Sequence, residues 1–433
     1  MKTKEKTVET KKKSKGKKAL KVICIILAVI IGAAGICAVL SATGNKANIE
    51  KISAFEKVEK ADRLVPEKDE DGNWTFTTDR DFKVMQLTDV HIGGGFMSLK
   101  KDSMALNAVA AMIKAEEPDL VIATGDVSYP VPFQAGTFDN LASAKVFAAL
   151  MEKLGVYWTL GFGNHDTEAY SYHNRADISE FYSSEDFEYC LFQSGPEDVD
   201  GYGNQIINVK NSDGIVTQSV FVFDSHSYID GDVLGIMWKY DNIHENQVVW
   251  YEESLNKINA RNAEIAKEKD LDIPETVKSA AFFHIPLTEQ KDAWYEFADN
   301  GFADTENVKL IYGTAGEGKK VVYPGVGEDG LFEKMLELGS TQAVFCGHDH
   351  YNNFSLEYKG IRLTYGMSID YLAYPGIYKE GSQRGCTVIT FSPDGSFDCK
   401  AESYYQEKYA SVYDKETVDM QELTTVAIAD EYK

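Results

Sequence analysis

Cysteine is scarce in this chain, and its spacing excludes a thiolate metal site. Only six cysteines occur among 433 residues, and no two have the CxxC spacing typical of structural zinc sites. Two fall in an N-terminal apolar run and four are scattered through the body: Cys24 and Cys37, then Cys190, Cys346, Cys386 and Cys399. Four scattered thiols in so large a body do not make a disulfide framework, and any pairing is left undetermined.

Positive charge is also scarce, except at the start of the chain. Residues 1–21 contain ten of the 44 basic residues but only two of the 68 acidic ones, so 34 basic and 66 acidic residues remain for the rest. A body with this excess of negative charge repels nucleic acid and anionic lipid headgroups. We therefore expect no nucleic-acid partner.

Long uncharged stretches are absent except for one, Val22–Leu40, which follows the basic segment. Its 19 residues would span roughly 28 Å as a helix, close to the hydrocarbon thickness of a bilayer. Because lysines crowd one side only, the positive-inside rule predicts a cytoplasmic segment at 1–21, a single-pass anchor at 22–42 and an extracytoplasmic body in the cell membrane. The alternative is a cleaved signal peptide and a secreted body.

Composition divides the body into three parts. Residues 43–80 are polar and charged, and we interpret them as a stalk or linker that leads into the domain. Residues 81–404 carry the apolar segments of a folded domain, and residues 405–433 form an acidic tail that we expect to be loosely attached.

The order of apolar segments predicts an α/β fold. Strands and helices alternate over the first half of the domain, at 83–88, 102–117, 119–125, 138–155 and 156–161. This alternation favours parallel strands joined by crossover helices. The second half predicts a strand pair near 204–224, a long helix at 245–269, buried strands at 279–286 and 342–347, and a hairpin with a Pro-Asp-Gly turn near 386–401. Together the segments predict two sheets with helices outside.

Five of these strands are followed directly by polar side chains that can bind a metal ion. In chain order these are Asp89 and His91, Asp126, Asn164 with His165 and Asp166, His284, and His348 with His350. The carboxyl ends of parallel strands form the rim where ligands bind, so the five groups are predicted to meet there. Each group alone is weak evidence, but five of the eight histidines of the chain fall in them.

Carboxylate, amide and imidazole ligands suit Zn, Fe or Mn. Seven such side chains are too many for one tetrahedral ion. A carboxylate such as that of Asp126 can bridge two ions, which is the arrangement of two-metal hydrolysis.

Five motifs in this order resemble those of the calcineurin-like metallophosphoesterase family. They are Asp-Val-His (89–91), Gly-Asp (125–126), Gly-Asn-His-Asp (163–166), His284 and Gly-His-Asp-His (347–350). The stretches "EEPDLVIATGD", "FGNHD", "FFHIPL" and "LTYG" further resemble its purple-acid-phosphatase-like branch. The resemblance covers about residues 80–400 and implies a four-layer α/β/β/α sandwich.

The resemblance also implies roles for these side chains, carried over by motif position. One ion would be held by Asp89, His91 and His350, the second by Asn164, His284 and His348, with Asp126 between them. His165 would not bind metal but would protonate the leaving group, and Asp166 would tune its pKa. The ligand set leaves the metal identities open among Fe, Mn and Zn.

Tyr129 departs from the simple pattern. Purple acid phosphatases have a tyrosine at this spacing that ligates Fe(III), but their first motif has Gly where this chain has His91. With both residues present, Tyr129 is either a metal ligand or part of the loop wall.

The resulting expectation is a membrane-anchored phosphohydrolase that cleaves phosphomonoesters or phosphodiesters by metal-activated hydroxide attack. The alternative is a metal-binding sensor or binding protein on the same fold without turnover. The substrate and the oligomeric state are not indicated by the sequence.

Overall fold

The computed structural model describes residues 2–232, 234–317, 321–327, 329–374 and 384–409. The expected tail at 405–433 lies outside the described residues beyond position 409. Several side chains of the expected anchor at 22–42, those at positions 30, 31, 33, 34, 37 and 38, also lie outside them.

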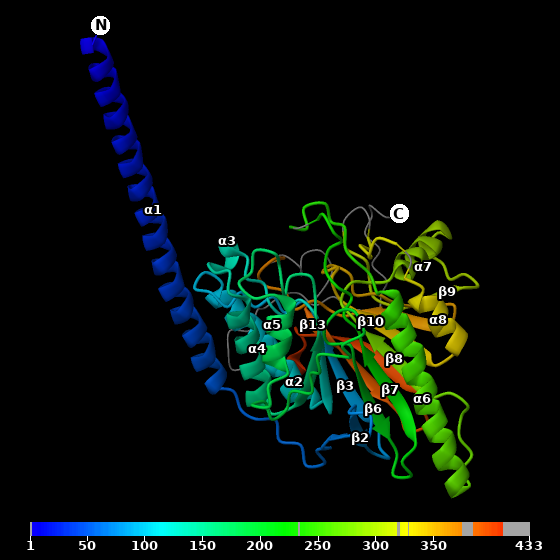
Figure 1. The fold of residues 1–433 in the computed structure, drawn as a ribbon. Coiled ribbons are helices and arrows are strands. Elements are labelled where there is room, and N and C mark those ends of the chain that lie inside the picture. The colour runs from blue at the N-terminus through cyan, green and yellow to red at the C-terminus, as the bar shows by residue number, and fades with distance from the viewer. Residues whose placement is uncertain (1, 233, 318–320, 328, 375–383, 410–433) are drawn as a thin grey trace.

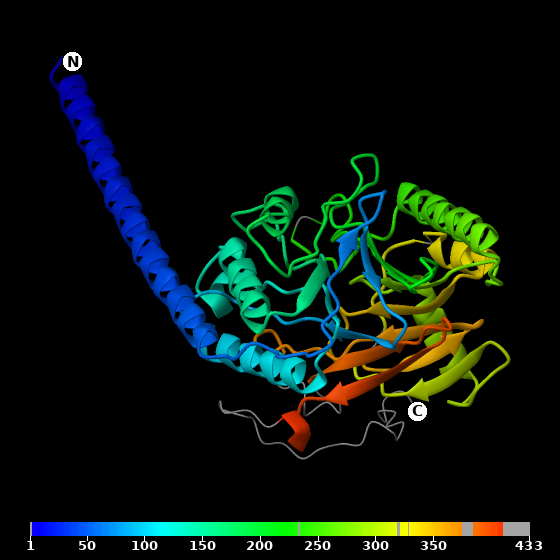
Figure 2. The same ribbon diagram turned by 90° about the horizontal axis from the view of Figure 1, so that it is seen from below.

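The first helix, α1 (Lys2–Ser53), contains the expected anchor. Among the residues searched, which are the described ones, no helix is both long and apolar enough to cross a membrane. In Figures 1 and 2, α1 extends beyond the domain on the side of α4 and away from α6.

The smaller sheet has five strands and confirms the predicted crossovers. In spatial order it consists of β14 (Phe397–Ser403), β13 (Gly385–Phe391), β3 (Phe82–Leu87), β4 (Leu120–Thr124) and β5 (Tyr157–Gly161). The last three strands are parallel and are joined by helices α2 (Leu99–Glu116) and α4 (Asn140–Leu154). The predicted hairpin is the antiparallel pair β13–β14.

The larger sheet has nine strands. Their spatial order is β1 (Glu67–Lys68), β2 (Trp74–Thr77), β6 (Gln205–Lys210), β7 (Val216–Val222), β8 (Lys278–Phe282), β10 (Thr341–Cys346), β12 (Ile361–Tyr365), β11 (Ser355–Tyr358) and β9 (Val308–Tyr312). From β7 to β12 the pairs are parallel, so β7, β8 and β10 end at one edge. The remaining helices are α3 (Pro132–Ala135), α5 (Arg175–Tyr182), α6 (Glu245–Lys269), α7 (Thr288–Asp299), α8 (Leu331–Leu338) and the short 3-10 helix η2 (Glu407–Tyr409).

Hydrophobic side chains form three buried clusters that hold the sheets and helices together. One lies between the sheets and includes Val84, Ile122, Val220 and Phe345. A second joins the five-stranded sheet to α2 and α4, and a third joins the nine-stranded sheet to α6, α7 and α8. Figure 1 shows α2 and α4 on one side of the strands and α6 and α8 on the other. Alternate strand residues thus face different clusters, as period-two patterning requires.

The interpretation of residues 43–80 as a stalk is wrong for much of its length. Ile52, Phe55 and Val58 are buried in the cluster that contains α2 and α4. Strand β2 pairs in parallel with β6 inside the large sheet. The apolar residues at 52, 55 and 58 are few and stand among charged neighbours. The local composition therefore gave no sign that tertiary packing buries them.

The junction between α1 and the domain is closely packed. A Cβ atom at Gly44 would lie 2.8 Å from the carbonyl carbon of Gly95 and 2.9 Å from Cα of Phe96. Asn48 donates through Nδ2 to Asp102, whose carboxylate also accepts from the backbone N–H groups of Gly93 and Gly94. The end of α1 therefore supports the loop that follows His91.

The domain also extends past residue 404, so the predicted start of the tail is corrected. Tyr405 and Tyr409 are buried in the same cluster as α2, and the hydroxyl of Tyr409 donates to Glu116. Aromatic burial of this kind anchors the chain through residue 409.

Two acidic side chains lie near the start of α7 and α8, of which Glu289 is buried and Asp329 is half-buried. Burial raises the pKa of Glu289 to about 7, and the neighbouring carboxylates of Asp329 and Glu333 add to the shift. Burial likewise raises the pKa of Asp329 to about 6. The folded chain therefore holds protons here that the unfolded chain releases at lower pH.

We expect Ile52→Ala to lower the free energy of unfolding by about 2–4 kcal/mol, because it removes a buried side chain from a packed cluster. Ile49→Ala on the exposed face of the same helix is the matched control and should change it by less than about 0.5 kcal/mol. Urea unfolding of the full chain measures both. Equal, small effects would restore the stalk interpretation.

A second prediction concerns pH. Because the folded-state pKa of Glu289 is raised, its contribution to stability falls as pH rises from about 4.5 to about 7 and is constant above. Glu289→Gln removes the titrating carboxyl group, so the variant should not lose this stability as the pH rises. Its free energy of unfolding minus that of wild type should therefore rise by about 1–3 kcal/mol between pH 5 and pH 8. Glu264→Gln, on the exposed part of α6, is the control. A parallel pH dependence in wild type and Glu289→Gln would contradict the prediction.

Candidate metal centre

The seven predicted ligands all follow the carboxyl ends of strands that share one rim. They come from β3 (Asp89, His91), β4 (Asp126), β5 (Asn164), β8 (His284) and β10 (His348, His350). Parallel pairing within each sheet sets the ends of these strands side by side. The sandwich brings the two sets of ends together.

The backbone at the rim is unusual in conformation. Asp89, His91, Asp126 and His348 all have positive φ angles, at 50°, 51°, 50° and 75°. Side chains other than Gly rarely adopt this region, and such strain concentrates at functional sites. These residues lie within four positions of the ends of β3, β4 and β10.

Four of the ligands form one compact group. Each of Asp89, His91, Asp126 and His350 offers a ligand atom within 4.8 Å of the others, and all four side chains are buried. Nε2 of His91 lies 3.3 Å from Oδ2 of Asp126, and Nε2 of His350 lies 3.4 Å from Oδ1 of Asp89. This group contains the three residues predicted for the first ion and the predicted bridge.

The other three predicted ligands form a second group, which also meets Asp126. Nε2 of His284 lies 3.1 Å from Oδ2 of Asp126 and 3.1 Å from Oδ1 of Asn164. Nδ1 of His348 lies 3.3 Å from the same His284 nitrogen. The other nitrogen of His284 donates to the carbonyl of Thr124 at 2.9 Å, which leaves Nε2 with its lone pair toward the group.

Two glycines allow these groups to approach so closely. A Cβ at Gly163 would lie 2.2 Å from Oδ1 of Asp126, and a Cβ at Gly347 would lie 1.9 Å from the hydroxyl of Thr88. Both positions precede predicted ligands. Glycine is therefore required here by close approach of neighbouring side chains.

Asp370, which the sequence analysis did not identify, holds two of the imidazoles. Its carboxylate lies 3.4 Å from Nδ1 of His91 and 3.1 Å from Nδ1 of His350, and it is fully buried. Burial alone lowers the pKa of His91, but the carboxylates of Asp370 and Asp126 outweigh it and raise that pKa to about 10. A carboxylate behind a ligating imidazole fixes the ring and increases its basicity.

His165, the predicted proton donor, lies beside Asp126 and is partly exposed. Its backbone N–H donates to Oδ1 of Asp126 at 2.7 Å, which fixes it beside the ligands. Its side chain is 27% exposed, whereas the ligand imidazoles of His91 and His284 are wholly buried. Its Nδ1 lies 2.7 Å from Oε1 of Glu168.

Asp166 makes other contacts than those expected of it, and Glu168 is the carboxylate that contacts the His165 ring. The Asp166 carboxylate accepts from the backbone N–H groups of Asp126, Ser128 and Gly163 at 2.8–3.0 Å. These bonds turn it away from the His165 ring and make it a brace between two rim loops. A side chain directly after His165 and one three residues on can both approach a ring in a tight turn, so sequence spacing did not separate them.

Tyrosines complete the wall of the site. The hydroxyl of Tyr228 donates to Glu168 and accepts from Nδ2 of Asn164, both at 3.0 Å. The ring of Tyr240 lies 4.2 Å from that of His348, and the ring of Tyr374 lies 4.3 Å from that of His350. None of these three was identified from the sequence, because scattered tyrosines carry no local signal.

Tyr129 stacks on His91, with ring centroids 4.5 Å apart and planes at 17°. Burial and the carboxylates of Asp370 and Asp126 raise the pKa of Tyr129, which favours its protonated form. The structure thus places it in the wall of the site, and its role as a ligand stays a prediction.

The side chains present fit a pair of cations. Oδ1 of Asp89 is buried and, within the described residues, accepts no hydrogen bond. A buried carboxylate oxygen without a partner is costly unless a cation satisfies it. The remaining donors are the carboxylate, amide and imidazole types that Zn, Fe and Mn share.

Of the missed residues, Asp370 alone had a usable signal. It follows the strand "IRLTYG" in "MSID", as Asp89 follows its own strand. The chain leaves this strand near the rim. The expectation that polar residues just after a buried strand lie at the rim would therefore have included Asp370. Glu168 and the tyrosines lie in loops whose paths could not be inferred.

The sequence matches known proteins over most of its folded part. The calcineurin-like phosphoesterase family model matches residues 82–352. A protein of Arabidopsis thaliana named probable inactive purple acid phosphatase 28 is 27% identical over 69% of this chain and 73% of its own length. Phosphatase DCR2 of Saccharomyces cerevisiae is 29% identical over 65% of this chain and 46% of its own length.

A dimetal phosphatase from Danio rerio is similar in structure, with a TM-score of 0.47 and 11% identity over 75% of this chain and 97% of that one. The family match covers more than half of the chain and includes all seven predicted ligands. The chain belongs to the calcineurin-like phosphoesterase family, in its purple-acid-phosphatase-like branch.

Proposed function

We propose that the protein is a dinuclear-metal phosphohydrolase that cleaves phosphomonoesters or phosphodiesters. The observation that carries this proposal is the convergence of seven donor side chains on one rim around Asp126. Family membership supports phosphoesterase chemistry in general.

Asp89, His91 and His350 would hold one cation, and Asn164, His284 and His348 the other, with Asp126 between them. When bound, two cations would neutralise phosphoryl oxygens and lower the pKa of bound water, with Fe, Mn or Zn fitting the ligands. Asp370 and the Thr124 carbonyl orient the imidazoles. The protein's net charge of -24 gives phosphate no general attraction, so affinity has to arise locally at this centre.

His165 would donate a proton to the departing oxygen. It is exposed beside Asp126, and Glu168 accepts from its Nδ1, which leaves Nε2 available to the substrate. A positioned general acid contributes about 10²–10⁴ in rate. Tyr228 joins Glu168 to Asn164, so the acid and the ligand set are held in one network.

A second candidate is a metal-binding sensor without turnover. Three plant relatives carry the words "probable inactive" in their names, which favours this alternative, whereas the yeast relative is named a phosphatase. The paired His165 and Glu168 favour catalysis, because a binding protein has no use for an oriented acid. Bound metal without hydrolysis across a broad panel of phosphate esters would support the sensor.

We further propose that α1 anchors the domain to the cell membrane with the domain outside the cytoplasm. The supporting observations are the uncharged run Val22–Leu40 and the lysine-rich segment on one side of it. We also propose the four-layer α/β/β/α arrangement, supported by the three hydrophobic clusters that separate helices from sheets.

The first test uses three variants of the full chain. Asp126→Asn and His348→Ala should abolish hydrolysis of a chromogenic phosphate ester with added Mn, Fe or Zn and should reduce bound metal. His165→Ala should keep its metal and lose about 10²–10⁴ in kcat. Elemental analysis with kinetics separates the two outcomes, and three variants with wild-type activity would refute the proposal.

The second test separates Glu168 from Asp166. Glu168→Gln should reduce kcat by about 10–100-fold with metal content and stability retained, because it disturbs only the orientation of His165. Asp166→Asn should instead lower the free energy of unfolding by about 1–3 kcal/mol, because its amide cannot accept all three backbone hydrogen bonds. The reverse pattern would return the predicted role to Asp166.

A further inference from the structure

Large apolar side chains are exposed on a loop above the metal centre. The segment 234–240 precedes α6 and carries four of them: Leu234, Ile236, Met237 and Trp238. Ile236 is 76% exposed and Trp238 is 64% exposed. Four exposed apolar side chains within five positions are uncommon on a soluble surface and indicate a binding face.

A second exposed apolar group lies around α3. Phe133 is 89% exposed, and Met97 and Tyr172 from neighbouring loops are also exposed. Figure 1 shows α3 and the green loop that precedes α6 projecting from the same end of the domain. Both exposed apolar groups therefore lie on segments at one end of the domain, and α1 extends past the domain at that end.

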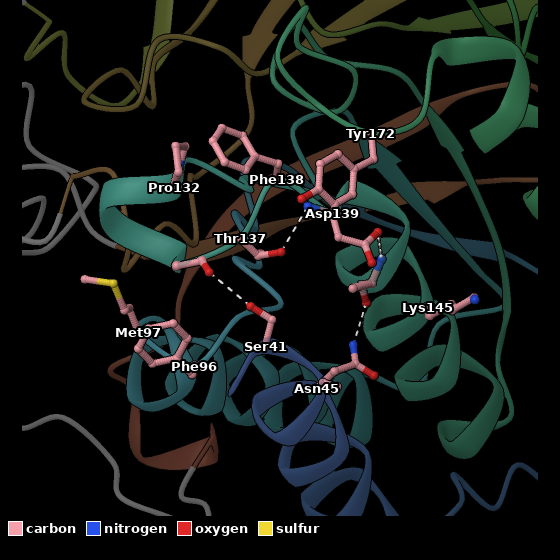
Figure 3. Close-up of a pocket in the computed structure, with 13 residues that line it drawn as sticks. Ser41, Asn45, Phe96, Met97, Pro132, Thr137, Phe138, Asp139, Lys145 and Tyr172 are labelled. Atoms are coloured by element: carbon pink, nitrogen blue, oxygen red, sulfur yellow. Dashed lines mark hydrogen bonds between the residues drawn. The ribbon is translucent and has the colours of Figure 1, made fainter. Parts of the chain in front are cut away.

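A cavity of 530 Å³ lies where α1 meets this end of the domain. Figure 3 shows Ser41 and Asn45 of α1 opposite Met97, Phe138 and Tyr172. Ser41 donates to the carbonyl of Gly136, and Asn45 donates to that of Ala142. The apolar run of α1 thus ends against the loop around α3.

We propose that this end of the domain docks on a lipid bilayer and that the substrate is a phosphate ester borne by a lipid. The proposal rests on the proposed function and deepens it. The apolar side chains of α1, such as Ile36 and Val39, are exposed and require the same non-aqueous surroundings as Phe133 and Trp238. One lipid surface satisfies all three segments at once.

The chemistry of the face favours neutral lipid over an anionic surface. The chain outside residues 1–21 has 66 acidic and 34 basic residues, so attraction to anionic headgroups is excluded and apolar insertion has to provide the affinity. Trp238 and Tyr172 are residue types that prefer the boundary between acyl chains and headgroups. Lys239 beside Trp238 can extend its charge outward.

The same loop reaches from the lipid surface to the metal centre. Tyr228 and Tyr240 pair as an antiparallel bridge across its two arms. Tyr228 contacts Asn164 and Glu168, and Tyr240 lies against His348. At its base, His226 stacks on His244 with ring centroids 3.9 Å apart. A headgroup at the surface beside Trp238 is therefore close to the rim.

Tryptophan quenching tests the docking. The full chain is reconstituted in phosphatidylcholine vesicles with and without brominated acyl chains, which quench tryptophan only on contact. Residues 1–53 contain no tryptophan, so α1 contributes nothing to the signal. We expect wild type to be quenched and Trp238→Phe to lose at least half of that quenching. Equal quenching of both would overturn the docking.

Kinetics tests the substrate class. Hydrolysis of a dialkylglycerol phosphate in the vesicles is compared with hydrolysis of a soluble chromogenic ester. Ile236→Ser and Phe133→Ser should each lower the rate on the lipid substrate at least tenfold and leave the soluble substrate unchanged. Val65→Ser is the control, since it is 67% exposed and precedes β1 and β2 at the other end of the domain.

Three further outcomes are decisive. Equal loss on both substrates would show a damaged centre and overturn the lipid assignment. If wild type hydrolyses neither substrate, the proposed function is overturned. The tryptophan-quenching experiment would then still decide whether the domain docks on the bilayer, because it does not depend on activity. A change of oligomeric state in Ile236→Ser, seen by light scattering in detergent, would show that a second copy covers this face and would overturn the lipid proposal.

Discussion

The carboxylates of Asp89, Asp126 and Asp370 are all buried, each lies 3.1–3.4 Å from a histidine imidazole, and the rest of the rim is arranged to compensate their charge. Burying three negative charges is prohibitive unless cations or protonated groups neutralise them. Imidazoles of four histidines surround them for this reason. The strained backbone and the close glycines follow from the same need, because donors from two sheets must converge on so small a volume.

Much of this arrangement could be predicted from the sequence because it depends on local pattern. The strands β3, β4, β5, β8 and β10 are short apolar runs that end in polar residues, and parallel pairing sets their ends on one edge. The long helix predicted at 245–269 is α6 with the same bounds. Strand-end position therefore sufficed to bring the seven ligands together.

What could not be predicted depends on contacts distant in the sequence. Ile52 and β2 lie in a segment that is polar on average, yet both are buried by packing against parts of the chain far away. Asp370 approaches His91 only because β12 pairs with β10. Glu168, and not Asp166, contacts the His165 ring, because the path of a loop decides which carboxylate faces a ring.

The close contact of Gly44 with Gly95 fixes the orientation of α1 relative to the domain. A domain joined to a helix by a flexible linker adopts many positions and orientations relative to that helix. Here the helix is continuous from Lys2 to Ser53 and meets the domain backbone without an intervening side chain, so helix and domain turn as one piece. The position and orientation of the candidate metal centre relative to α1 are thereby fixed by this one contact. A bulkier residue at position 44 would change the angle between α1 and the domain.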